Sequence, residues 1–160
     1  MLKPAALYKG MLEQKMKEWY YTEDMMYYSG CLNNVLPDVD EVPDETLYQY
    51  AIVSDKGNLI GFLSYRIDYY SSVAYNFGLF SFDRGNITIG RDTFNKLEEL
   101  TDKFHTVTWR MVSGNPAERN YDSFCKKHNG EKIIIRDYIK DREGNYRDSI
   151  IYNIINEAIK

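Results

Sequence analysis

The feature that most constrains the fold of this sequence is a series of β-rich segments in the middle of the chain. Residues 48–54 alternate in the way of a strand, and residues 55–58 read Asp-Lys-Gly-Asn, which is typical turn sequence. β-rich sequence resumes over 59–67. A third segment covers 73–82, and Gly78 in its interior suggests a bulge or a close backbone approach. We therefore expect a hairpin followed directly by a third strand.

Helical periodicity appears on both sides of this block. The first stripe is Tyr8, Leu12, Met16 and Trp19, and Thr22 is placed to cap a short second helix that Gly30 would stop. The later stripes are Ile89, Phe94, Leu97, Leu100 and Phe104, and then Ala117, Tyr121, Phe124, Cys125 and His128. Pro116 suits the first position of that last helix. Residues 106–112, 133–139 and 149–155 complete the prediction as strands, the last two forming a hairpin.

The predicted order is helix, helix, three strands, helix, strand, helix and two strands. This order favours an α/β (α+β) fold whose mixed sheet is mostly antiparallel, with parallel pairing where a helix crosses between strands. With 160 residues, 44% of them hydrophobic and 28% charged, the chain has ordinary globular proportions. We expect one domain over 1–160.

Composition argues against several classes of function. A net charge of −4 disfavours nucleic-acid binding, which normally needs a basic face. Cys31 and Cys125 lie far apart, with no spacing that suits zinc, so we expect reduced thiols and no metal. No apolar run approaches the length of a membrane span, and no leader pattern begins the chain, which predicts a cytoplasmic protein. His105 and His128 are interpreted as structural residues.

Three stretches resemble the GNAT superfamily of acyl-CoA-dependent N-acyltransferases. Residues 48–65 contain the hairpin and the Leu-Ile-Gly61 that follows it. Residues 80–91 read Phe-Ser-Phe-Asp-Arg-Gly-Asn-Ile-Thr-Ile-Gly-Arg, and residues 114–124 begin Gly-Asn-Pro-Ala-Glu-Arg-Asn-Tyr. The resemblance covers about 48–152 and implies the GNAT fold, with the first strand missing or reduced to residues 1–3.

The resemblance also implies a site for the cosubstrate acetyl-CoA. A turn that leads into a helix N-terminus exposes backbone N–H groups to a pyrophosphate, and small residues let the phosphates approach. Gly90 aligns with the last glycine of the family pattern, while Thr88 stands where the first is expected. The implied cofactor-binding residues are Phe80, Ser81, Phe82, Arg84, Gly85, Thr88, Ile89, Gly90, Arg91 and Asn115.

Tyr121 is the residue to which the resemblance assigns catalysis, as the acid that protonates the departing thiolate. Asn115 and Tyr121 lie six residues apart, one fewer than in the family pattern. Tyr121 also belongs to an apolar stripe, so the role of a core tyrosine stays open beside that of an acid. No general base is identified, and water is left as a relay for the proton.

Three functional hypotheses follow. The first is an N-acetyltransferase whose acceptor, a small-molecule or peptide amine, binds near the first two helices and residues 33–46. The acidic residues between 38 and 45 would attract a cationic acceptor. The second is a non-catalytic GNAT-like binding module. The third is an interaction protein on an unrelated α+β fold, which would have an exposed apolar patch and no V-shaped opening between 73–82 and 106–112. The apolar segment 150–155 leaves a homodimer open through strand pairing.

Overall fold

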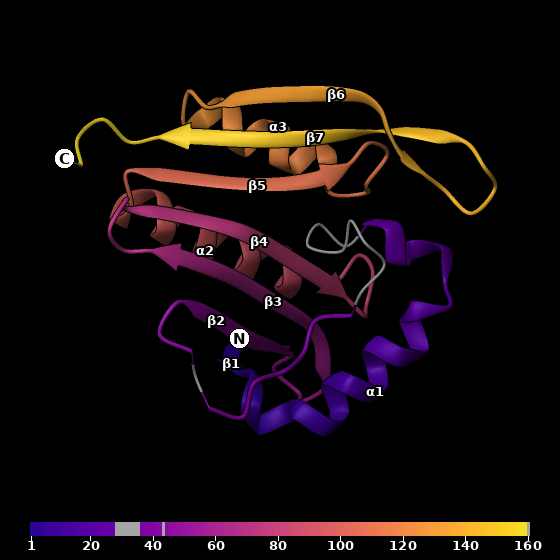
Figure 1. Cartoon of the computed structure of the whole chain (residues 1–160). Helices are drawn as coiled ribbons and strands as arrows, with labels where there is room; N and C mark the ends of the chain where they lie inside the picture. Colours follow the sequence, from indigo (N-terminus) through magenta and orange to yellow (C-terminus); the bar gives the residue numbers. More distant parts are fainter. Residues whose placement is uncertain (28–35, 43, 160) are drawn as a thin grey trace.

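The computed structural model describes residues 1–27, 36–42 and 44–159. It contains a seven-stranded sheet in the order β1-β2-β3-β4-β5-β7-β6, flanked by helices (Figure 1). The first elements are β1 (Leu2–Pro4), the 3₁₀ helix η1 (Ala5–Tyr8), α1 (Lys9–Tyr20), the 3₁₀ helix η2 (Glu23–Tyr27), β2 (Leu47–Val53), β3 (Leu59–Asp68) and β4 (Val73–Ser81). They are followed by α2 (Ile87–Lys103), β5 (Thr106–Val112), α3 (Glu118–Lys127), β6 (Glu131–Lys140) and β7 (Tyr146–Ile155).

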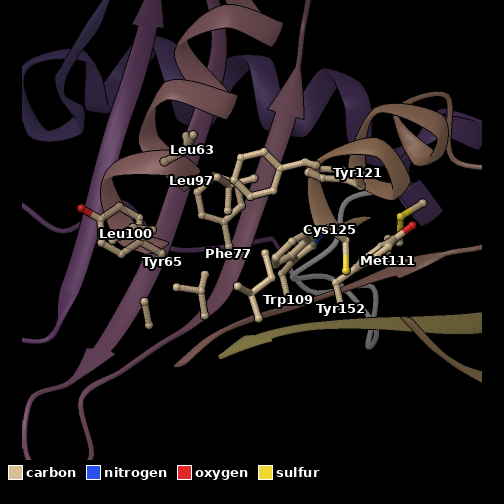
Figure 2. Packing of buried hydrophobic residues seen from close by; sticks show 14 of the residues in the cluster. Leu63, Tyr65, Phe77, Leu97, Leu100, Trp109, Met111, Tyr121, Cys125 and Tyr152 are labelled. Atoms are coloured by element: carbon tan, nitrogen blue, oxygen red, sulfur yellow. The ribbon is translucent and has the colours of Figure 1, made fainter. Parts of the chain in front are cut away.

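The sheet separates two layers of helices. Figure 1 shows α2 and α3 behind the sheet and α1 in front of its first strands. Alternation along the strands supplies a buried cluster to each face: Leu63 belongs to the cluster under α2 and α3, whereas its neighbour Phe62 belongs to the one under α1. The core on the α2 and α3 side is the larger and contains Trp109 and Tyr152 (Figure 2).

The N-terminal helix forms where its periodicity predicts. Leu12 and Met16 of α1 are buried against the sheet, and Trp19 packs at the margin of the same cluster. The hydroxyl of Thr22 donates to the carbonyl of Trp19 and so gives a hydrogen-bond partner to a carbonyl in the last turn of α1. Gly30, predicted as a helix stop, and Cys31 lie outside the described residues.

The first four strands are antiparallel neighbours, and the first strand is reduced to three residues, as predicted. β3 and β4 slip by one residue, because Ser64 pairs with Gly78 while Arg66 pairs with Tyr75. The extra residue lies in β4 beside Gly78, where Asn76 has a φ of 53°. This is a β-bulge, and it confirms the irregularity that Gly78 indicated.

β4 and β5 are parallel and diverge almost at once. Their register consists of Val73↔Thr106 and Ala74↔Val107, at the beginning of both strands. Beyond these pairs the C-terminal end of β4 continues to pair with β3, and β5 continues to pair with β7. The sheet therefore opens between its two halves, which excludes the unrelated fold for which no such opening was expected.

The last hairpin places most of the apolar segment 150–155 inside the sheet. β7 pairs with β5 on one edge, and its residues 149–153 pair with β6 on the other, so this part of the segment has no free edge for another chain. The outer strand is β6, in which Ile133 and Ile134 are exposed. The start of α3 also differs from the prediction: α3 begins at Glu118, after a turn that contains Pro116.

Candidate active site

A cavity of about 870 Å³ lies where β4 and β5 diverge. Its walls come from the end of β4, from the loop and first turns of α2, from the loop after β5 with α3, and from Trp19 and Tyr27. The volume is within the range of roughly 300–1,000 Å³ that is usual for ligand sites. Segments far apart in the sequence thus meet around one space.

Most of the residues predicted for the site line this cavity. These are Phe80, Ser81, Arg84, Gly85, Ile89, Gly90, Arg91, Asn115 and Tyr121. Phe82 and Thr88 do not. Phe82 lies beyond the end of β4, where its ring packs edge-on against Trp19 at 6.0 Å between centroids. Thr88 is buried, and the side chain of Asn86 already accepts its N–H at 3.0 Å.

The N-terminus of α2 forms one end of the cavity. Asn86 is its N-cap, a role typical of asparagine. No partner within the described chain accepts the backbone N–H groups of Gly85 and Ile87, and both residues line the cavity. A Cβ added to Gly90 would meet nothing within 4 Å. Open donors and open space at a helix N-terminus suit an anionic group.

The charges around this end have both signs. Arg84, Arg91 and Lys127 line the cavity. The Lys127 ammonium contacts both carboxylate oxygens of Glu98 at 2.9 Å, and this hydrogen bond is the main cause that lowers the pKa of Glu98. Asp83 adds a carboxylate beside the loop, where its Oδ2 accepts from the side chain of Asn86 at 2.7 Å.

Tyr121 lies at the inner wall of the cavity and is 3% exposed. It extends from α3 toward α2 (Figure 2), and its ring contacts Phe94, Trp109 and Tyr152. Burial raises the pKa of its phenol, so the hydroxyl keeps its proton throughout the neutral range. Tyr121 is thus both a core residue and a part of the cavity wall.

Asn115 is held by two hydrogen bonds within the protein. Its Oδ1 accepts from the N–H of Ala117 at 2.9 Å, which shapes the turn before α3. Its Nδ2 donates to the carbonyl of Tyr27 at 2.8 Å, across 88 residues of sequence. The side chain therefore connects the loop after β5 to the 3₁₀ helix η2.

Sequence reasoning missed several lining residues. They are Trp19, Tyr27, Asn86, Ile87, Thr93, Phe94, Pro116, Ala117, Asn120, Ser123, Phe124 and Lys127. Asn86 had a local signal, because an asparagine before an apolar helical stripe is a typical N-cap. Trp19 and Tyr27 had none, since only the tertiary fold brings α1 and η2 to the opening.

The acidic segment lies elsewhere. Glu41 pairs with Lys9 at 3.0 Å and Asp44 with Arg66 at 3.3 Å, and neither carboxylate lines the cavity. The described residues hold no cluster of three or more His, Cys, Asp or Glu side chains suited to a metal ion. Among the same residues, no helix is both long enough and apolar enough to span a membrane.

Known structures share this architecture, although no family model and no curated protein sequence matches the chain. The spermidine N-acetyltransferase of Vibrio cholerae, solved with CoA and spermine, is similar with a TM-score of 0.68 and 16% identity over 97% of this chain and 94% of that one. The ribosomal-protein-S18-alanine N-acetyltransferase of Escherichia coli is similar with a TM-score of 0.53 and 16% identity over 74% and 77%. The chain therefore has the GNAT fold that its three sequence stretches predict.

Proposed function

We propose that this protein is an N-acetyltransferase that transfers the acetyl group of acetyl-CoA to an amine. The observation that carries the proposal is the cavity between the diverging strands, because it joins an anion-binding helix N-terminus to a buried, protonated tyrosine. A thioester cosubstrate with a pyrophosphate at one end and a leaving thiolate at the other requires this combination. The similarity of the fold to N-acetyltransferases supports the same reading.

The cosubstrate is assigned to the side of α2 and α3. The pyrophosphate would accept from the N–H groups of Gly85 and Ile87, with Arg84 and Arg91 adding positive charge. The pantetheine arm would lie along β4 from Leu79 toward the bulge, on the edge that β5 leaves beyond Ala74. Phe82 and Thr88 do not line the cavity and have no part in this assignment, and neither has Asn115, whose side chain is engaged by Tyr27 and Ala117.

The acetyl transfer balances without a further reactant. The lone pair of a neutral amine forms a C–N bond with the thioester carbonyl carbon, and the electron pair of the broken C–S bond leaves on sulfur. Tyr121 gives its proton to that thiolate, and the proton lost from the amine restores the phenol through solvent. Backbone N–H groups near the bulge are the candidates for stabilising the oxyanion.

The test is direct. Calorimetry with acetyl-CoA measures binding, and release of free CoA thiol in the presence of an amine measures turnover. Spermine and alanine-ended peptides are suitable first amines, because the two similar proteins are named for spermidine and for an alanine of a ribosomal protein. Failure to bind acetyl-CoA at high micromolar concentration would exclude the enzyme.

Two observations favour a second function, that of a non-catalytic module with the same fold. Asn86 occupies the N–H of Thr88, and Asp83 places a negative charge beside the anion-binding end. Both features weaken the attraction for a pyrophosphate. A module of this kind would bind acetyl-CoA weakly or not at all, and Asp83→Asn would strengthen binding without producing turnover.

A further inference from the structure

Hydrogen bonds from Arg142 and Asn115 attach residues 19–27 to the half of the sheet that contains β5, β7 and β6. Residues 19–27, which include the end of α1 and all of η2, form this wall, and Trp19 and Tyr27 are its lining side chains. We call it the α1–η2 wall. The body of α1 packs on the first half of the sheet through Leu12 and Met16. The wall leaves that half and crosses to the side of β5 and β7.

Arg142 holds the beginning of the wall. It lies in the turn between β6 and β7, and its guanidinium donates to the carbonyl of Tyr20 at 2.7 Å and to that of Tyr21 at 2.9 Å. These carbonyls lie at the C-terminus of α1, where no further helical turn supplies N–H groups to bond them. A planar guanidinium offers two N–H groups in a fixed fork, and its positive charge suits the negative end of the helix dipole. Arg142 thus caps α1 from more than 120 residues away.

The turn that carries Arg142 is built to present it. The buried carboxylate of Asp141 accepts the N–H groups of Glu143 and Asn145 and pairs with Arg147 at 3.3 Å. Burial alone would raise the pKa of Asp141, but the hydrogen bonds from Asn145 and Arg147 lower it below its usual range. The turn therefore keeps its shape at neutral pH. The loop between β6 and β7 extends to the same side of the molecule as the end of α1 (Figure 1), and Arg142 reaches that end through its two hydrogen bonds.

Asn115 holds the other end of the wall. Its amide donates to the carbonyl of Tyr27, the last residue of η2, while its oxygen is engaged by Ala117. The family resemblance assigns Asn115 to the cofactor. In this chain the Asn115 amide group instead donates to the α1–η2 wall, on the side where an acceptor amine would enter.

We propose that Arg142 and Asn115 are positioning residues that hold the α1–η2 wall across the opening between β4 and β5, so that Trp19 and Tyr27 form the acceptor end of the cavity. β4 and β5 join the halves of the sheet at one end through Val73 and Ala74. The hydrogen bonds of Arg142 and Asn115, which we call the clamp, join the two halves of the sheet at the other end. The claim that this end receives the amine rests on the proposed function, whereas the clamp itself does not.

Acrylamide quenching of tryptophan fluorescence tests the clamp without a substrate. The chain has two tryptophans, and Trp109 is 2% exposed, so quenching of the folded protein reports on Trp19. Arg142→Ala should raise the quenching constant, and Arg142→Lys should raise it less, because lysine keeps the charge and loses the fork. Arg136→Ala, at an exposed arginine of β6, is the matched control and should change nothing. Equal quenching in all four proteins would overturn the clamp.

Separate measurements of amine KM and acetyl-CoA Kd show whether Arg142 and Asn115 act on the acceptor side or on the cosubstrate side of the cavity. In Arg142→Ala and Asn115→Asp, the KM for a probe acceptor amine such as spermine should rise about fivefold, as expected for a lost charge-assisted or partly buried hydrogen bond. The Kd for acetyl-CoA should stay within about twofold. A parallel loss of acetyl-CoA affinity would overturn the assignment of these residues to the acceptor side. If the wild-type protein binds no acetyl-CoA, the proposed function fails while the quenching result still decides the clamp.

Discussion

Tyr121 and Tyr152 provide a matched test of catalysis against stability. The two rings are neighbours in the core, 6.1 Å apart, and both are buried. Their hydroxyl groups differ. That of Tyr152 donates to Asp122 at 2.6 Å, whereas no hydrogen bond joins the Tyr121 hydroxyl to the described residues, although Tyr121 lines the cavity. Replacing each tyrosine by phenylalanine keeps the ring and removes only the hydroxyl.

The two variants should therefore behave in opposite ways. Tyr121→Phe keeps the ring contacts with Phe94 and Trp109, so its free energy of unfolding should stay within about 0.5 kcal/mol of wild type. Its turnover should fall about 10²-fold or more, since general acid catalysis contributes roughly 10²–10⁴. Tyr152→Phe loses a hydrogen bond to a charged group that solvent partly screens, which costs about 1 kcal/mol, and it should retain turnover.

Urea unfolding gives the free energies, and release of CoA thiol from acetyl-CoA with an accepted amine gives the turnover. Binding of acetyl-CoA to Tyr121→Phe should persist, because the phenol acts on the leaving thiolate and not on the pyrophosphate. The reasoning is refuted if Tyr121→Phe and wild type turn over equally. In that case Tyr121 is a core residue alone.

Three other predictions concern the glycine of β3, the acidic network of α3 and the charge of the cavity. In Gly61→Ala the new Cβ would lie 2.7 Å from the backbone oxygen of Phe80, so we expect a loss of about 1–3 kcal/mol in urea unfolding and weaker acetyl-CoA binding. Burial would raise the pKa of Asp122, but the hydrogen bonds from Lys132 and Tyr152 and the charge of Lys132 together outweigh it, and the folded pKa is lowered. The Asp122 carboxylate therefore stabilises the fold above its unfolded pKa near 4, and this stabilisation is lost as the pH falls through the lower folded pKa. In Asp122→Asn, the loss of stability at acid pH should be smaller in a stability–pH curve. Arg91→Gln should weaken acetyl-CoA binding about two- to fivefold at low salt and less at high salt, as calorimetry at two ionic strengths would show.

Local sequence was sufficient for the elements and for much of the site. Spacings within a few residues were enough to predict the apolar stripe of α1, the hairpin of β2 and β3, and the inward position of Tyr121. Such spacings do not depend on which distant segments pack nearby. The loop before α2 was likewise readable, because a helix N-terminus exposes its N–H groups whatever surrounds it. Nine of the eleven site residues named from the sequence accordingly line the cavity.

Only the tertiary structure decided how distant segments meet. The end of pairing between β4 and β5 at Ala74 creates the opening, and no local pattern records where two parallel strands part. β7 lies between two strands, although its apolar sequence would suit an edge equally well. Asn115 reaches Tyr27, and Arg142 reaches the end of α1, across 88 and more than 120 residues. Such contacts form between surfaces that the completed fold brings together, so their partners cannot be inferred from either sequence neighbourhood alone.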